Sequence, residues 1–117
     1  MNGKILIVDD EPAQQQLLRY NIEKSGFDVL LADNGNDALN IVDEVKPDLI
    51  VLDWMIPKAS GIDVCYELRS RPETRYLPIL MVSARGEDID LAMALDAGAD
   101  DYITKPFSPR ELIARIK

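Results

Sequence analysis

Five short apolar runs alternate with five helix-like segments along the whole chain. The runs have the length of β-strands and cover residues 4–8, 29–31, 49–52, 78–82 and 102–104. The spacing of apolar residues predicts helices over about 11–25, 38–45, 60–71, 87–97 and 109–117. Strict alternation predicts one α/β domain with a doubly wound, five-stranded parallel sheet. Helices should cover both faces, and the expected strand order is 2-1-3-4-5.

Local signals mark several of the predicted helix ends. Ser60–Asp63 and Ser108–Glu111 have the spacing of capping boxes, and Pro109 suits a first helical position. Gly98 is suited to end the fourth helix. The first helix is expected to present four apolar residues to the core: Ala13, Leu17, Leu18 and Ile22.

Charge and residue usage exclude several classes of function. A net charge of −8 argues against binding of nucleic acid or an anionic membrane by this domain. The chain has no histidine, which excludes the usual zinc sites and any histidine base or phosphohistidine of its own. A lone cysteine, Cys65, cannot form an intrachain disulfide, and we expect it to pack inside the third helix. With no signal sequence and no membrane-spanning run, we expect a cytoplasmic protein.

The third apolar run ends abruptly at a carboxylate. Residues 49–52 are continuously aliphatic, as in a strand buried on both faces, and Asp53 follows directly. An unpaired charge inside such a layer is unfavourable, so Asp53 is expected where the strand leaves the sheet. Ligands bind at the carboxyl ends of strands in open α/β sheets, which makes Asp53 a candidate site residue.

The ends of the other strands supply a matching set of polar groups. Asp9 and Asp10 follow the first strand, Ser83 the fourth and Lys105 the fifth. Three crowded carboxylates repel unless a cation lies among them, and an all-oxygen ligand set indicates Mg²⁺, or Mn²⁺. Lys105 can balance a phosphate and Ser83 can donate a hydrogen bond to it. We interpret Asp53 as a nucleophile that accepts a phosphoryl group.

Each of these residues also has a simpler interpretation when taken alone. Asp10 can be a helix N-cap, Ser83 a turn residue and Lys105 a surface charge. Tyr102 alone is an ordinary edge-strand residue. Trp54, which follows the candidate nucleophile, is expected to point outward and to serve as a fluorescent reporter.

The motifs at the strand ends resemble those of a known family. Asp9-Asp10, Leu52-Asp53, Ser83-Ala84 and Lys105-Pro106, in this order, are similar to the response-regulator receiver domain of two-component signalling, whose fold is CheY-like. The resemblance covers the whole chain. The segments 84–87 and 98–109 look like the OmpR/PhoB subfamily, most closely its phosphate-regulon regulators.

The resemblance implies a role for each matching residue. Asp53 would accept phosphate from a sensor histidine kinase, and Lys105, preceding a cis proline, would contact that phosphate. The ligands of Mg²⁺ would be Asp10, Asp53 and the backbone carbonyl of Met55, with Asp9 acting through water. Ser83 and Tyr102 would form the switch pair, in which the hydroxyl moves to the phosphate and the ring swings inward. The two variable positions that tune dephosphorylation are Met55 and Arg85.

The resemblance also implies an output surface. Phosphorylation would alter the face formed by the fourth helix, fifth strand and fifth helix and so promote a homodimer. Residues that fit the family pattern of intersubunit ion pairs there are Asp100, Asp101, Glu111, Arg115 and Lys117. Leu91 departs from the pattern, because relatives commonly carry a basic residue that can pair with Glu111. We expect a winged-helix DNA-binding domain beyond residue 117, through which the whole protein would regulate transcription.

Four rival functions are open to a chain of this pattern. One is a stand-alone receiver that acts through protein–protein contacts. A degenerate receiver that serves only as a scaffold is disfavoured by the intact set of acids. Another is a metal-dependent phosphatase with an aspartyl nucleophile, but such enzymes need an acid two residues after the nucleophile of the first strand, where this chain has Pro12. A flavin- or nucleotide-binding module is disfavoured because the chain has no glycine-rich phosphate motif.

Overall fold

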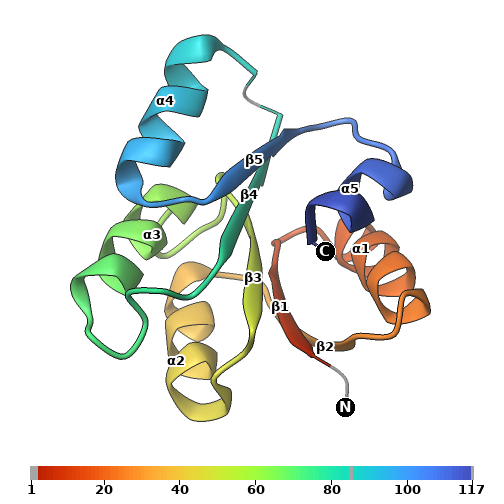
Figure 1. The fold of residues 1–117 in the computed structure, drawn as a ribbon, viewed down its shortest axis with the longest axis horizontal. Helices are drawn as coiled ribbons and strands as arrows, with labels where there is room; N and C mark the ends of the chain where they lie inside the picture. Colours follow the sequence, from red (N-terminus) through yellow and green to blue (C-terminus); the bar gives the residue numbers. More distant parts are fainter. Residues whose placement is uncertain (1–2, 85, 117) are drawn as a thin grey trace.

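The computed structural model describes residues 3–84 and 86–116 and contains a single parallel sheet (Figure 1). The strand order is β2-β1-β3-β4-β5, as the alternation predicts. The strands are β1 (Lys4–Val8), β2 (Asp28–Ala32), β3 (Leu49–Asp53), β4 (Ile79–Ser83) and β5 (Asp101–Thr104). The helices are α1 (Pro12–Lys24), α2 (Gly35–Val45), α3 (Gly61–Ser70), α4 (Asp88–Ala97) and α5 (Pro109–Ile116).

Helices cover both faces of the sheet (Figure 1). Side chains alternate along β1, so Ile5 and Ile7 pack with the buried residues of α1 and α5, whereas Leu6 and Val8 pack on the other side with α2, α3 and α4. Cys65 is fully buried within this second cluster, as the sequence predicts. Among the described residues, no helix has the length and apolar composition needed to cross a bilayer.

The strand register brings the carboxyl ends of the strands level with one another. Val8 lies opposite both Ala32 and Leu52, and Asp53 lies opposite Val82. Residues that follow β1 and β3 therefore emerge side by side at one edge of the sheet. This edge is where the sequence places the candidate site.

The predicted face of the first helix is only half correct. Leu18 and Ile22 are buried, but Ala13 is exposed and Leu17 is 51% exposed. Ala13 and Leu17 lie outside the narrow arc that contains Leu18 and Ile22, because successive residues are rotated by 100° around a helix. Gln15, in contrast, lies on the inward side.

Capping interactions define the starts of α2, α3, α4 and α5, with the Oδ1 of Asn34 accepting the N–H of Asp37 at 2.8 Å at α2. Ser60 and Asp63 form the predicted capping box of α3, and Glu87 and Asp90 form another at α4. The Oγ of Ser108 accepts the backbone N–H of Glu111 at 3.0 Å at the start of α5. Each bond satisfies a donor that the first helical turn cannot pair internally.

The carboxyl end of α4 is tied to α3 by one arginine. Arg69 donates hydrogen bonds to the carbonyls of Gly98 at 2.9 Å and Leu77 at 2.7 Å, and to the Asp100 carboxylate at 3.0 Å. Gly98 has a φ of +118°, and a Cβ there would lie 2.5 Å from the Cγ of Arg69. Gly98 is therefore required both by its conformation and by the space that Arg69 fills.

Candidate functional site

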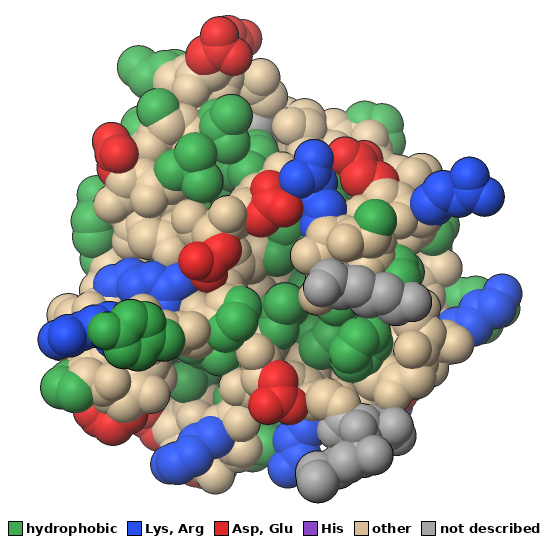
Figure 2. Space-filling view, in the orientation of Figure 1, with side chains coloured by type: hydrophobic (Ala, Val, Ile, Leu, Met, Phe, Trp, Pro, Cys, Tyr) green, Lys and Arg blue, Asp and Glu red, His purple; other side chains and the backbone are tan. Residues whose placement is uncertain are grey.

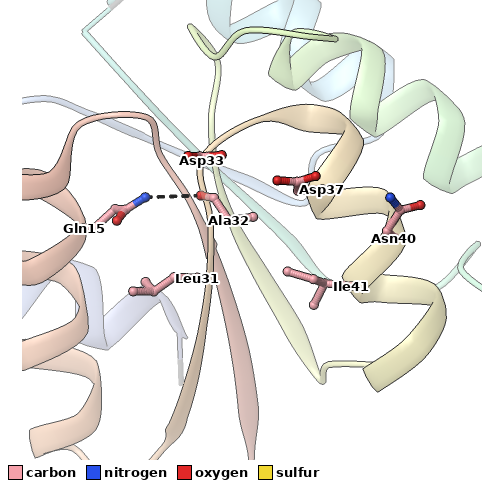
Figure 3. A pocket seen from close by; sticks show the side chains of 7 residues that line it. All are labelled: Gln15, Leu31, Ala32, Asp33, Asp37, Asn40 and Ile41. Atoms are coloured by element: carbon pink, nitrogen blue, oxygen red, sulfur yellow. Dashed lines mark hydrogen bonds between the residues drawn. The ribbon is translucent and has the colours of Figure 1, made fainter.

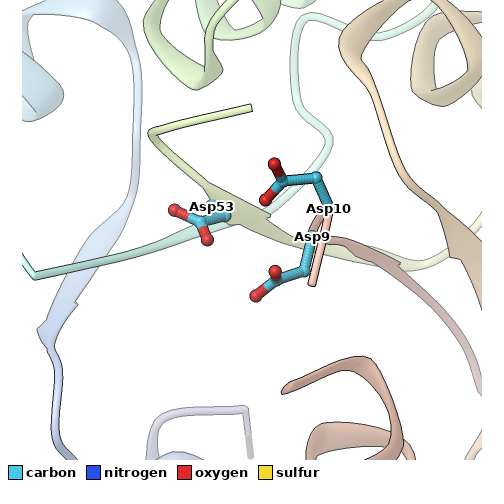
Figure 4. Close-up of side chains that lie close together, drawn as sticks. All are labelled: Asp9, Asp10 and Asp53. Atoms are coloured by element: carbon cyan, nitrogen blue, oxygen red, sulfur yellow. The ribbon is translucent and has the colours of Figure 1, made fainter. Parts of the chain in front are cut away.

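Three carboxylates meet at the carboxyl edge of the sheet. Oxygen atoms of Asp9, Asp10 and Asp53 all lie within 4.8 Å of one another (Figure 4). Asp9 and Asp53 are 1% and 7% exposed, whereas Asp10 is exposed. The separation is short enough for all three side chains to bind one cation directly or through water.

The backbone after β1 positions Asp9. Its N–H donates to the carbonyl of Ala32 at 3.1 Å, which continues the pairing with β2 for one residue. Its Oδ1 accepts the N–H of Glu11 at 2.9 Å. Glu11 is the N-cap of α1, so the acid that satisfies a donor at this helix start is Asp9. The simpler interpretation of Asp10 as an N-cap is therefore wrong.

Asp53 is held at the last position of β3. Its Oδ1 accepts the N–H of Met55 at 3.1 Å, and its Oδ2 accepts a hydrogen bond from the Nζ of Lys105 at 2.9 Å. The exposed Met55 follows directly in the turn, so its backbone lies beside the carboxylate cluster. The predicted metal role of the Met55 carbonyl stays a prediction.

Lys105 reaches the cluster from the end of β5. Its N–H donates to the carbonyl of Ser83 at 2.7 Å, and the peptide bond to Pro106 is cis, as the family resemblance implies. The Nζ also lies 3.5 Å from the Oδ2 of Asp9. Burial lowers the pKa of Lys105, but its bonds to Asp53 and Asp9 outweigh that effect and raise the pKa above its usual value. These contacts thus favour the cationic form of Lys105.

The charges at the site fit a divalent cation. Burial is the main cause of the raised pKa of Asp9; the Glu11 N–H and Lys105 oppose the shift, and Asp53 adds to it. One lysine faces three carboxylates, so the cluster has an excess of negative charge. Oxygen-only donors with space for water are the ligand set that Mg²⁺ prefers. The residues present therefore fit the predicted Mg²⁺ site.

The predicted switch residues lie on the neighbouring strands β4 and β5. Ser83 is fully buried at the end of β4, and Tyr102 on the neighbouring strand is 8% exposed. Trp54 is 6% exposed, so the prediction that it points outward is wrong. It packs edge-on against Tyr102, with ring centroids 6.3 Å apart and planes at 82°. Packing against this ring removes the apolar surface of the indole from water. This gain favours a buried side chain, although Trp54 lies in a turn, where side chains are usually exposed.

The predicted dimer residues are paired within the chain in this structure. Arg115 donates two hydrogen bonds to Asp101, at 2.8 and 2.9 Å, and lies 3.8 Å from Glu111. Asp100 accepts from Arg69 and from the N–H of Ile79. On the face shown in Figure 2, hydrophobic side chains gather over α4, and acidic and basic side chains alternate toward α5. Arg85 and Lys117 lie outside the described residues.

A separate cavity of about 380 Å³ lies beside the carboxyl end of β2 (Figure 3). Its lining residues are Gln15, Leu31, Ala32, Asp33, Asp37, Asn40 and Ile41. None of the three clustered acids lines this cavity. The candidate functional site is therefore the cluster of carboxylates with Lys105, and not the cavity. Gln15, whose amide bonds the backbone of Asp9, is not among the residues predicted for the site. Its spacing from Leu18 and Ile22, three and seven residues, is the available signal for an inward polar side chain.

Comparison with known proteins agrees with this geometry. The sequence model of the response regulator receiver domain matches residues 5–117. The chain is 54% identical over 117 residues to the alkaline phosphatase synthesis transcriptional regulatory protein PhoP of Bacillus subtilis (strain 168), covering 100% of this chain and 48% of that protein. It is 52% identical to the phosphate regulon transcriptional regulatory protein PhoB of Rhizobium meliloti (strain 1021), again over 100% of this chain and 52% of that protein.

The chain thus spans about half the length of these curated relatives. Among solved structures, the BeF3-activated N-terminal receiver domain of Klebsiella pneumoniae RstA superimposes with a TM-score of 0.90. That protein is 33% identical, with 97% of this chain and 94% of that chain covered. The chain belongs to the response regulator receiver domain family and resembles regulators of the OmpR/PhoB type.

Proposed function

We propose that Asp53 is the phosphoacceptor of a two-component signalling switch. The observation that carries this proposal is the joint contact of Asp53 with two acids and one lysine: three carboxylates lie within 4.8 Å, and the Nζ of Lys105 is 2.9 Å from Oδ2 of Asp53. A nucleophile, a phosphate-neutralising cation and a metal ligand set thus occur in one place. Membership of the receiver family supports the phosphohistidine of a sensor kinase as the phosphoryl donor. That histidine would belong to the partner, since the chain has none of its own.

In the proposed step, a carboxylate oxygen of Asp53 attacks phosphorus. A new O–P bond forms, the P–N bond of the phosphohistidine breaks, and the imidazole nitrogen keeps the bonding electrons and takes up a proton. The product is a mixed anhydride on Asp53. Lys105 balances the charge of the phosphoryl oxygens, and the N–H of Met55 keeps the carboxylate oriented.

Asp10, Asp53 and the carbonyl of Met55 would bind Mg²⁺ (or Mn²⁺), with Asp9 acting through water. An ion bound by these residues would supply positive charge that offsets the negative charge developing in phosphoryl transfer. The excess of negative charge left when one lysine faces three carboxylates supports this assignment. Exposed Met55 and position 85 are proposed to tune access of water to the anhydride.

The output is proposed to pass through Ser83 and Tyr102 to the face of α4, β5 and α5. Because Arg115 is already paired with Asp101 within the chain, dimer formation exchanges ion pairs and gains few new ones. Exposed Leu91 and Leu95 then provide apolar surface for the homodimer. The printed names of the curated relatives support a role in transcription, exerted by an output domain outside these residues. A cytoplasmic location remains part of the proposal.

Acetyl phosphate and Mg²⁺ provide the direct test. Intact-mass spectrometry should show one added phosphoryl group on the wild type and none on Asp53→Asn. Asp96→Asn, a change at an exposed acid of α4, is the matched control and should be labelled like the wild type. Labelling of Asp53→Asn to the wild-type level would remove Asp53 from the role. Continuous release of phosphate from an ester would favour the phosphatase alternative.

A further inference from the structure

Gln15 is a polar residue on the core-facing side of α1. It precedes the buried Leu18 by three residues and the buried Ile22 by seven, so the three side chains share one helix face. Its neighbours Gln14 and Gln16 are the same residue type: Gln14 lines a cavity with Lys105 and Pro106, and Gln16 is exposed. Within the described part of the chain, Gln15 is the glutamine of this run whose amide bonds the backbone at the ends of β1 and β2.

The Gln15 amide joins the ends of two strands. Its Nε2 donates to the backbone carbonyl of Asp9 and to that of Ala32, the latter at 3.4 Å (Figure 3). The same Ala32 carbonyl accepts the N–H of Asp9 at 3.1 Å. Asp9 lies just beyond the last residue of β1, where the sheet no longer supplies a partner for its carbonyl. The glutamine takes the place of that missing strand partner.

The peptide that Gln15 holds is the one that leads into Asp10. A peptide unit is planar, so fixing the carbonyl of Asp9 also fixes the direction in which the chain enters Asp10. The carboxylates of Asp9 and Asp53 have partners of their own in Glu11, Met55 and Lys105. The exposed carboxylate of Asp10 has no hydrogen bond or ion pair with another residue in 3–84 or 86–116. Its placement depends on the backbone.

We infer that Gln15 is a positioning residue for the cation site: its amide orients the Asp9–Asp10 peptide and thereby keeps Asp10 beside Asp53. This inference rests on the proposed function, since it assumes that Asp10 binds the divalent ion. Side chains that orient metal ligands through hydrogen bonds commonly change metal affinity without contacting the metal.

Gln15→Met tests the inference because it keeps the length of the side chain and removes the donor. The 380 Å³ cavity next to position 15 leaves room for the methyl group without repacking. Gln16→Met is the matched control: the residue is exposed, and its side chain has no hydrogen bond to another part of the described chain. Magnesium binding is measured by titration calorimetry, and exchange of the Glu11 amide by NMR in the presence of EDTA.

We expect Gln15→Met to weaken Mg²⁺ binding by about three- to tenfold, the range for loss of one hydrogen bond. Exchange of the Glu11 amide, whose N–H donates to Asp9, should become faster in the metal-free protein, while Gln16→Met matches the wild type in both measurements. Gln15→Asn, whose amide is withdrawn by one methylene, should reproduce the weakening if the methionine variant does not fold.

Two outcomes separate the inference from the proposed function. Wild-type affinity and wild-type amide exchange in both position-15 variants would overturn the role of Gln15 and leave the phosphoacceptor proposal intact. Failure of the wild-type protein itself to bind Mg²⁺ would overturn the cation site, and this inference with it.

Discussion

Replacing Asp9 by asparagine should stabilise the metal-free protein although it removes a residue of the site. Asp9 is 1% exposed and lies among two other acids. The asparagine Oδ1 can still accept the N–H of Glu11, so the start of α1 keeps its hydrogen bond. The main change is the loss of one buried negative charge.

The magnitude follows from the distances. Carboxylate oxygens that lie within 4.8 Å of one another repel by at least about 3.5 kcal/mol at an effective dielectric constant of about 20. The pair of Asp9 and Lys105 at 3.5 Å attracts by about 4.7 kcal/mol on the same basis. Removing the charge abolishes two repulsions and one attraction. Solvent screens the exposed Asp10, so the net stabilisation should be about 1–2 kcal/mol, and relief of Asp9 burial adds to it.

Thermal and urea unfolding in EDTA provide the assay. A gain of about 1.5 kcal/mol corresponds to roughly 6 °C in Tm for a domain of this size. In excess Mg²⁺ the wild type should recover this difference, because a ligand that binds only the folded state stabilises it by mass action. Asp96→Asn is the control and should change stability by less than about 0.5 kcal/mol. An Asp9→Asn protein that is less stable than the wild type in EDTA would refute the reasoning.

The same effect should depend on pH. The pKa of Asp9 is raised in the folded state, mainly by burial, so the ionised group destabilises the fold above that pKa. As the pH falls through the raised pKa toward the unfolded value of about 3.9, the wild type takes up a proton and the penalty disappears. The advantage of Asp9→Asn should therefore be present at neutral pH and absent below about pH 4. A constant difference across this range would show that charge is not its cause.

Two further predictions concern the fold around the site. Gly98→Ala should lower the free energy of unfolding by about 1–3 kcal/mol, because the residue has a φ of +118° and its Cβ would clash with Arg69. Denaturant unfolding measures the loss of stability. In an Arg69→Ala protein, Gly98→Ala should cost less, because the clash with Arg69 is gone and only the backbone strain remains. An unfolding midpoint that Gly98→Ala leaves unchanged would contradict this explanation. Burial raises the pKa of the Cys65 thiol to about 12, so a thiol reagent at neutral pH should modify it only as fast as the protein opens. Rapid modification of the folded protein would contradict its placement in the core.

Much of the candidate site could be predicted from the sequence. The alternation of strands and helices has few compact solutions, and in a parallel sheet the carboxyl ends of all strands meet at one edge. The convergence of Asp9, Asp53 and Lys105 follows from that geometry alone. The capping box at Ser60 is equally local, since its two partners are three residues apart.

Tertiary structure decided the features that depend on a partner distant in sequence. Trp54 is buried because Tyr102 on another strand covers it, and no pattern near residue 54 reports that contact. Arg115 and Asp101 pair within one chain because α5 packs back beside β5. The inward face of α1 contains Gln15 and not Leu17, because the carbonyls that end β1 and β2 require a donor at that point. The periodicity of the sequence identifies which residues can lie on one face of a helix. Only the assembled sheet determines which backbone groups lack a hydrogen-bond partner next to that face.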